Sequence, residues 1–300
     1  MNSELVLPRV KLSNSHSVSV IDIEDDALPR KTADIVSDLR RVFKSNKTRP
    51  YSFRLAQLKN LVRFLQVEEE AICNALHQDL KKSKFEALCH DIEFALKDAK
   101  EVLRNLKKWM KPERPKKTVA NFFDDLYIYN DPYGVVLLIS PWNFPVQLLI
   151  IPLIGAIAAG NCVVIKPSEL APATAQLFAN LLPNYIDPQC YPVVLGGVEV
   201  TTELLQQRFD YIFFTGSPQV GKIVHLAANK YLTPTTLELG GKSPVYIDST
   251  ADMDITAKRI MWGKIQNAGQ VCVSPDYVLC TKKVQEKFVF YAAKALQQFF

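Results

Sequence analysis

The spacing of apolar residues divides the chain into two regions. Between residues 33 and 109, apolar side chains recur every three or four positions, which is the spacing of one buried face on each of several helices. After Pro132 the pattern changes to short apolar runs rich in β-branched and aromatic residues, at 135–139, 163–165, 193–195, 211–214 and 237–239. Each run is typical of a buried strand. The pattern therefore predicts a helical layer followed by a sheet.

Segments of helical length separate the predicted strands, at 146–159, 171–182, 200–207 and 220–228. Alternating strands and helices build a parallel sheet, so the predicted fold class is α/β. Ligands bind to such sheets beyond the carboxyl ends of the strands. We therefore expect the functional residues in the loops that begin near Ser140, Lys166, Thr215 and Glu238.

Residues 146–165 are long and apolar enough to be considered as a membrane span. Gln147 and Pro152 interrupt the stretch, and Gly160 with Asn161 marks a turn before a strand-like run. We therefore interpret these residues as a buried helix followed by a buried strand, and we expect no transmembrane segment.

Composition and charge narrow the class of partner. The 300 residues are 48% hydrophobic and 22% charged, which is the balance of a globular protein with a sizeable core. A formal net charge of +5 is too small to indicate a nucleic-acid partner. The densest basic run, at 107–117, contains two prolines, and we interpret it as a solvated linker.

The six cysteines show neither the spacing of a zinc site nor that of a disulfide framework. We therefore expect reduced thiols, no metal and a cytoplasmic protein. Residues 1–29 are acidic and lack the basic and apolar pattern of a secretory signal, and their acids argue against a mitochondrial presequence. We interpret residues 1–32 as a loose extension.

The first two strand-end loops carry polar groups suited to binding. Asn143, in Ser-Pro-Trp-Asn-Phe-Pro at 140–145, can donate a hydrogen bond from its carboxamide, but an asparagine before a helix is also a common N-cap. The next loop places Lys166 and Glu169 on one tight turn. Such a pair is often an exposed ion pair with no binding role. At a strand end, however, Glu169 can accept hydrogen bonds from ribose hydroxyls, with Lys166 supporting the same hydroxyls.

A glycine-bounded turn follows the strand at 211–214 and opens a helix. Free backbone amides and the helix dipole favour a phosphate at such a turn. The candidate cofactor-binding residues there are Thr215, Gly216, Ser217, Pro218, Gln219, Val220 and Gly221. The segment nearly matches the phosphate loop of nucleoside triphosphatases, but Ile223 stands where that loop requires a hydroxyl group for magnesium. We therefore reject a phosphate-loop enzyme.

Two further motifs carry reactive side chains. Glu238 lies between Leu237 and Leu239, and we expect these leucines to shield its carboxylate from water and so make it a general base, although capping by the following amides is the alternative. Cys272 ends the sequence Asn-Ala-Gly-Gln-Val-Cys. A cysteine among apolar residues is usually inert packing, but this loop leaves its sulfur and backbone amide free to face a cleft.

Together these motifs resemble those of the aldehyde dehydrogenase superfamily. Five stand in the family's order: Pro-Trp-Asn at 141–143, Lys-Pro-Ser-Glu at 166–169, Phe-Thr-Gly-Ser at 214–217, Leu-Glu-Leu-Gly-Gly-Lys-Ser-Pro at 237–244 and Gly-Gln-Val-Cys at 269–272. The resemblance covers residues 33–300 and is strongest for the class 3 and fatty aldehyde dehydrogenase branch. It implies a Rossmann-type parallel sheet with a helical N-terminal layer in a cofactor-binding domain at 33–236, and the start of a second α/β catalytic domain at 237–300.

The resemblance also implies a mechanism and a cofactor. Cys272 would attack an aldehyde whose oxygen is held by the Asn143 side chain and the Cys272 amide, and Glu238 would activate the water that hydrolyses the resulting thioester. The cofactor, NAD or NADP, would lie against Lys166, Glu169, the turn at 215–221 and Leu239. The substrate class would be medium-chain or long-chain aliphatic aldehydes or aromatic aldehydes.

The chain differs from the family in length. Family members continue beyond the position of Phe300, with a Glu-Ile-Phe-Gly-Pro motif whose Glu holds the nicotinamide ribose and with an oligomerisation strand of the family's homodimer, and neither sequence occurs here. We therefore expect a truncated chain that exposes apolar surface and has little activity. The competing hypotheses are an aldehyde dehydrogenase, a catalytically incomplete nucleotide-binding fragment and a cofactor-independent cysteine esterase.

Overall fold

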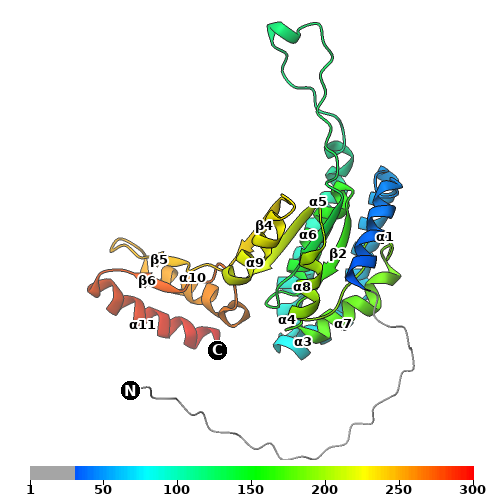
Figure 1. Ribbon diagram of the computed structural model, residues 1–300. Helices are drawn as coiled ribbons and strands as arrows, with labels where there is room; N and C mark the ends of the chain where they lie inside the picture. The colour runs from blue at the N-terminus through cyan, green and yellow to red at the C-terminus, as the bar shows by residue number, and fades with distance from the viewer. Residues whose placement is uncertain (1–30) are drawn as a thin grey trace, which may run out of the picture. The chain divides into compact units, whose positions relative to one another are not determined.

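The computed structural model describes residues 31–300. The helices before the sheet are α1 (Thr32–Lys44), α2 (Tyr51–Val67), α3 (Glu69–Leu80), α4 (Lys84–Ala87), the π-helix η1 (Leu88–Ile92), α5 (Glu93–Trp109) and the 3₁₀ turn η2 (Val119–Asn121). The sheet region contains β1 (Val135–Ile139), α6 (Gln147–Ala159), β2 (Cys162–Lys166), α7 (Pro172–Leu181), η3 (Leu182–Asn184), α8 (Val198–Gln206), β3 (Tyr211–Gly216), α9 (Pro218–Asn229) and β4 (Thr235–Leu239). The last elements are β5 (Pro244–Tyr246), α10 (Met253–Ile265), η4 (Gln266–Gly269), β6 (Tyr277–Leu279) and α11 (Lys282–Phe299), and Figure 1 labels most of this order.

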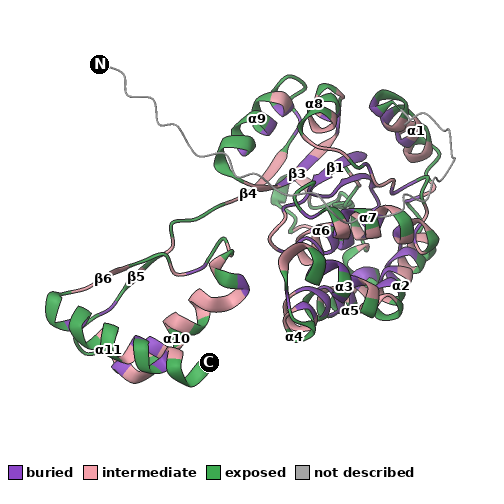
Figure 2. Cartoon of the chain, turned by 90° about the horizontal axis from the view of Figure 1, so that it is seen from below, coloured by how far each residue is buried: buried purple, intermediate pink, exposed green. Residues whose placement is uncertain are grey.

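The main sheet has the strand order β2-β1-β3-β4, with every pair parallel, within the described residues. β1 and β2 are buried at each position, as is typical of strands covered on both faces. Helix α6 packs on β1 and β2, and α9 packs on β3 and β4 from the opposite face (Figure 2). The strand order reverses between β1 and β3, so the crevice beyond their carboxyl ends is the expected ligand site.

The predicted helical layer is confirmed. Leu39, Leu61 and Leu96 are buried in the large core that also contains β1 and β2. The predicted buried helix and strand within residues 146–165 are confirmed as α6 and β2. Among residues 31–300, the helices are all too short or too polar to cross a membrane.

The predicted strand at 193–195 is wrong. Only Val193 pairs with β2, as an isolated bridge to Ile165, and the Val194 amide donates to the Ile165 carbonyl at 2.8 Å. The neighbouring Pro192 has no N–H with which to extend a ladder, and Gly196 turns the chain away with a φ of +139°. This segment therefore borders the sheet without becoming a strand.

Residues after β4 pack around a second, smaller cluster. Ile247, Met253 and Val284 form its buried centre, with side chains from α10 and α11 against it. β5 and β6 pair in parallel as a separate two-stranded sheet in the described chain. The basic run at 107–117 is largely exposed, and it begins inside α5, which ends at Trp109. The predicted extension at 1–32 lies, up to Arg30, outside the described residues.

Candidate active site

A cavity of about 660 Å³ opens beyond the carboxyl ends of β1, β2 and β3. Most of the site residues predicted from the sequence line it: Asn143, Lys166, Glu169, Thr215, Gly216, Ser217, Pro218, Val220, Glu238, Leu239 and Cys272. The predicted nucleophile, amide donor and carboxylate therefore share one cavity with the predicted cofactor residues. The cavity lies at the switch point of the sheet, where the strand order reverses between β1 and β3. Parallel sheets commonly bind ligands at this position.

Two predicted cofactor residues, Gln219 and Gly221, do not line this cavity. Gln219 is exposed on the first turn of α9. Gly221 is buried, and a Cβ at this position would come within 2.7 Å of the Leu239 side chain. Its glycine therefore serves the close packing of α9 against β4.

Cys272 is an exposed thiol placed by an unusual turn. Helix α10 ends in η4, where three consecutive residues have left-handed backbone: Asn267 with φ 48°, Ala268 with φ 56° and Gly269 with φ 78°. A Cβ on Gly269 would lie 3.1 Å from the Lys264 carbonyl oxygen, which favours glycine there. The turn reverses the chain so that Cys272 reaches the cavity instead of the protein core.

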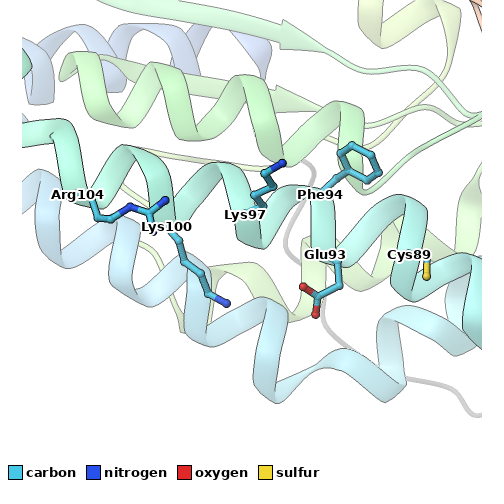
Figure 3. A pocket seen from close by; sticks show the side chains of 6 residues that line it. All are labelled: Cys89, Glu93, Phe94, Lys97, Lys100 and Arg104. Atoms are coloured by element: carbon cyan, nitrogen blue, oxygen red, sulfur yellow. The ribbon is translucent and has the colours of Figure 1, made fainter.

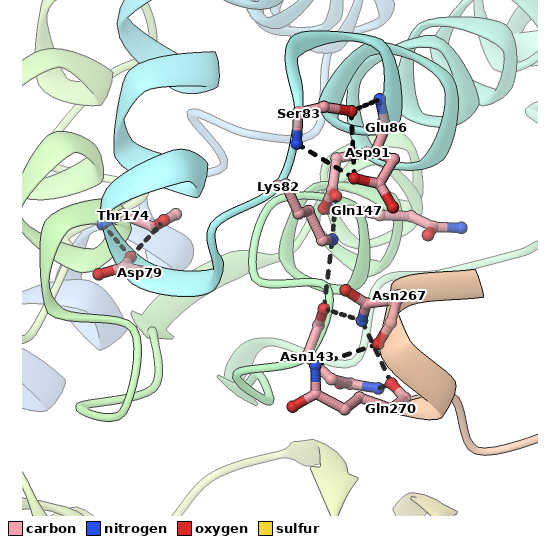
Figure 4. Close-up of polar contacts among 10 residues, drawn as sticks. All are labelled: Asp79, Lys82, Ser83, Glu86, Asp91, Asn143, Gln147, Thr174, Asn267 and Gln270. Atoms are coloured by element: carbon pink, nitrogen blue, oxygen red, sulfur yellow. Dashed lines mark hydrogen bonds and ion pairs between the residues drawn. The ribbon is translucent and has the colours of Figure 1, made fainter. Parts of the chain in front are cut away.

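Asn143 does not cap the following helix, so the N-cap alternative is wrong. Helix α6 has Val146 at its N-cap position and no side-chain cap. The Asn143 side-chain amide instead donates to the Gln270 carbonyl at 2.9 Å (Figure 4). Because a carboxamide has two N–H bonds, this contact orients the group and leaves a second N–H for a ligand. The loop after β1 is therefore bonded directly to the Cys272 loop.

The predicted desolvation of Glu238 is wrong. Glu238 is exposed on β4, which is an edge strand of the main sheet in the described chain. Side chains alternate between the two faces of a strand, so Leu237 and Leu239 project away from Glu238 and give it no cover. In register, Glu238 lies opposite Thr215 of β3. The carboxylate is therefore open to water from the cavity that it lines.

Lys166 and Glu169 form one polar group at the end of β2. The Lys166 ammonium donates to the Pro167 carbonyl at 2.6 Å and to the Glu169 carboxylate at 3.3 Å. Burial lowers the pKa of Lys166, and the nearby Glu169 carboxylate opposes that shift. The Glu169 side chain is 44% exposed, so its carboxylate can accept further hydrogen bonds from a ligand.

The predicted anion site lies at the start of α9. Ser217 is its N-cap, with a hydroxyl that accepts from the Val220 amide at 3.2 Å, and Pro218 occupies the first turn. Pro218 has no N–H, and the Val220 and Gly221 amides donate to Ser217, so this turn offers a phosphate the Gln219 amide and the positive end of the helix dipole. Together with a carboxylate suited to ribose hydroxyls, this arrangement fits a dinucleotide cofactor.

Sequence reasoning missed the wall that α8 contributes to the cavity. Val198, Thr201 and Leu205 line it at helical spacing, and Ile223 of α9 lines it as well. The spacing was visible in the sequence, but periodicity alone does not distinguish a cavity wall from a core face. The apolar side chains of Val198, Leu205 and Ile223 suit a flat aromatic base.

A second hollow, of about 400 Å³, lies on the surface of η1 and α5 (Figure 3). Its lining residues come from these two adjoining helices: Cys89, Glu93, Phe94, Lys97, Lys100 and Arg104. Four of the six are charged residues spaced along one helix, which is typical of a solvated face. We assign no function to it.

Residues 31–300 contain no group of three or more His, Cys, Asp or Glu side chains placed to hold a metal ion.

The fold is a parallel sheet with a cavity beyond the carboxyl ends of its strands, which is an architecture typical of nucleotide-binding α/β proteins. The model of the aldehyde dehydrogenase family matches residues 12–299, and the chain belongs to this family of NAD-dependent or NADP-dependent enzymes. The resemblance inferred from the five motifs is therefore confirmed.

Similar proteins include aldehyde dehydrogenase family 3 member B1 of Homo sapiens, 48% identical over 267 residues, which cover 89% of this chain and 57% of that protein. The dimeric NADP-preferring aldehyde dehydrogenase of Canis lupus familiaris is 45% identical over 270 residues, or 90% of this chain and 60% of that protein. A substrate-bound structure of Staphylococcus aureus AldH matches with a TM-score of 0.88 at 42% identity, covering 89% of this chain and 58% of that one. The chain thus spans less than two thirds of the length of these relatives.

Proposed function

We propose that this chain oxidises aldehydes to carboxylic acids with NAD or NADP as the hydride acceptor, through a thioester on Cys272. The observation that carries the proposal is the meeting of Cys272, Asn143 and Glu238 in one cavity at the switch point of the sheet. Medium-chain or long-chain aliphatic aldehydes and aromatic aldehydes are the proposed substrates. The largely apolar wall of the cavity supports this class of substrate.

The first chemical step is the attack of the Cys272 thiolate on the aldehyde carbon. As the C–S bond forms, the carbonyl oxygen becomes negative and accepts hydrogen bonds from the Asn143 side chain and the Cys272 amide. The bound cofactor supplies the acceptor for the hydride that then leaves the thiohemiacetal carbon. Cys272 is left as a thioester, with the substrate carbon oxidised by two electrons.

Glu238 acts in the second step. Its exposed carboxylate accepts a proton from a water molecule, and the oxygen of that water attacks the thioester carbon. The C–S bond breaks, the carboxylic acid leaves and Cys272 returns to the thiolate. The exposure of Glu238 supports this role, because the hydrolytic water must reach it.

Residues at the end of β2 and the start of α9 are proposed to hold the cofactor. The Glu169 carboxylate, oriented by Lys166, accepts from the adenosine ribose, and the first turn of α9 from Ser217 binds the pyrophosphate. We propose residues 33–236 as the cofactor-binding domain and residues 237–300 as catalytic. A homodimer and a cytoplasmic location stay predictions.

Absorbance at 340 nm tests this function directly. Purified chain is incubated with decanal and NAD⁺, and then with NADP⁺, beside a Cys272→Ala variant of equal thermal stability. The proposal predicts NADH or NADPH formation that depends on Cys272. Folded protein that binds the cofactor but forms neither would favour the incomplete nucleotide-binding fragment, and Cys272-dependent cleavage of p-nitrophenyl acetate without hydride transfer would favour the esterase.

A further inference from the structure

A buried ion pair lies directly beneath the loop that carries Asn143. Lys82 and Asp91 join through the ammonium and one carboxylate oxygen at 2.6 Å, and their side chains are 2% and 0% exposed. Removing two charges from water is costly, so such a pair adds little to stability by itself. What distinguishes this pair is the set of groups around it.

Asp91 reaches this position because it lies in the π-helix η1, between α4 and α5. The wider turn of a π-helix is rare and shifts side chains relative to an α-helix. One Asp91 carboxylate oxygen accepts from Lys82, and the other accepts from the Gln147 amide at 3.1 Å. The Lys82 ammonium also lies 4.2 Å from the centre of the Phe144 ring. The ion pair therefore contacts Phe144 and Gln147, which follow Asn143 in the chain.

The carbonyl of Asn143 itself receives two donors. The Lys82 ammonium donates to it at 3.3 Å, and the Asn267 side-chain amide donates at 2.8 Å (Figure 4). Asn267 is 4% exposed, and its amide also donates to the Gln270 carbonyl at 3.3 Å. Gln270 is the residue whose carbonyl holds the Asn143 carboxamide. Asn267 thus bonds the loop of the proposed oxyanion donor to the loop of the nucleophile.

We propose that Lys82, held by Asp91, and Asn267 are positioning residues that fix the Asn143 main chain so that its carboxamide faces the substrate oxygen beside Cys272. This inference rests on the proposed function, because it assigns the contacts a purpose in thioester formation. None of the three side chains lines the cavity. They act through Asn143.

Two reagents separate positioning of the donor from access to the thiol. Acylation of Cys272 by p-nitrophenyl acetate passes through an oxyanion, whereas alkylation by iodoacetamide does not. Loss of one oxyanion donor costs about 10²–10³-fold, and a misplaced donor retains part of its effect. We expect Asn267→Gly and Lys82→Met to slow acylation about tenfold and to leave alkylation within about twofold.

Matched controls follow from the structure. Ala268→Gly is made in the same left-handed turn but removes no hydrogen bond, and Asp79→Asn weakens the contact of α3 with the start of α7 at Thr174 (Figure 4). Both should leave the ratio of acylation to alkylation unchanged. If Lys82→Met does not fold, Asn267→Gly carries the test alone, because glycine adopts left-handed backbone freely.

A double-mutant cycle with Asn143→Ala decides how these residues act. In that background, Asn267→Gly should lower acylation by less than about twofold, because the group that it positions is already gone. A tenfold loss of acylation rate on Asn267→Gly in both backgrounds would overturn the inference. So would wild-type acylation rates in both Asn267→Gly and folded Lys82→Met, if Asn143→Ala is slow. If Asn143→Ala itself acylates at the wild-type rate, the proposed function fails at its oxyanion donor.

Discussion

Replacing Gly241 with alanine should displace the backbone of the nucleophile Cys272. A Cβ at this position would lie 2.7 Å from the Cys272 carbonyl oxygen, and this contact would have to lengthen to at least 3.0 Å. The obstructing atom belongs to the backbone of Cys272, so relief moves the nucleophile itself. Overpacking of this kind costs about 1–3 kcal/mol, and a full misplacement of about 1 Å costs about 10²-fold in rate, which sets the upper limit. We expect Gly241→Ala to slow Cys272 acylation about 10-fold to 100-fold.

Gly240 is the matched control, because a Cβ there would meet only Pro218, at 3.9 Å. Gly240→Ala and Gly241→Ala are compared by the p-nitrophenolate burst with the ester in excess, and by melting temperature. The expected result is a slow burst in Gly241→Ala and a change of less than about threefold in Gly240→Ala. Equal bursts in the two folded variants would refute the claim that Gly241 sets the position of Cys272.

Three further predictions follow from individual side chains. Glu238→Gln should form NADH in a single burst and then turn over at least about tenfold more slowly, because the thioester forms but its hydrolysis lacks a base; rapid-mixing absorbance at 340 nm measures both phases. Glu169→Gln should raise the preference for NADP⁺ over NAD⁺ about tenfold, by removing the carboxylate that repels a 2′-phosphate, as measured by kcat/KM for each cofactor. A hydrogen bond with Cys190 and burial raise the pKa of the Cys162 thiol above its ordinary value of 9.0. The folded chain thus keeps a proton that the unfolded chain loses, and stability falls as the pH rises above about 9, by up to about 1.4 kcal/mol per pH unit. In urea unfolding with reductant between about pH 8 and pH 10, Cys162→Ala should show a shallower fall than the half-buried control Cys280→Ala.

The sequence predicted the strands β1, β2, β3 and β4 and the loops at their carboxyl ends. Short apolar runs indicate the strands, and short sequence motifs mark the loops. The apolar run at 193–195 predicts a strand that does not form, because Pro192 and Gly196 flank it. Apolar runs report burial, but a ladder also needs donors along the strand. Burial and strand pairing are therefore separate predictions.

In the candidate site, too, short motifs predict which residues are functional but not what surrounds them. Cys272 and Asn143 could be identified from their motifs, whereas the environment of Glu238 could not be read from its neighbours. Adjacent residues in a strand point to opposite faces, so two flanking leucines say little about the carboxylate between them. Lys82 and Asp91 lie in no motif, and their contact depends on a π-helix that local spacing does not predict.

The proposed thioester on Cys272 can be detected by the mass of the Cys272 peptide after incubation of Glu238→Gln with decanal and NAD⁺, followed by acid quench and digestion. The proposed mechanism predicts an adduct on Cys272 whose mass equals that of the aldehyde less two hydrogens, formed only when NAD⁺ is present. An unmodified Cys272 in folded, cofactor-binding protein, or an adduct that forms equally without NAD⁺, would contradict it.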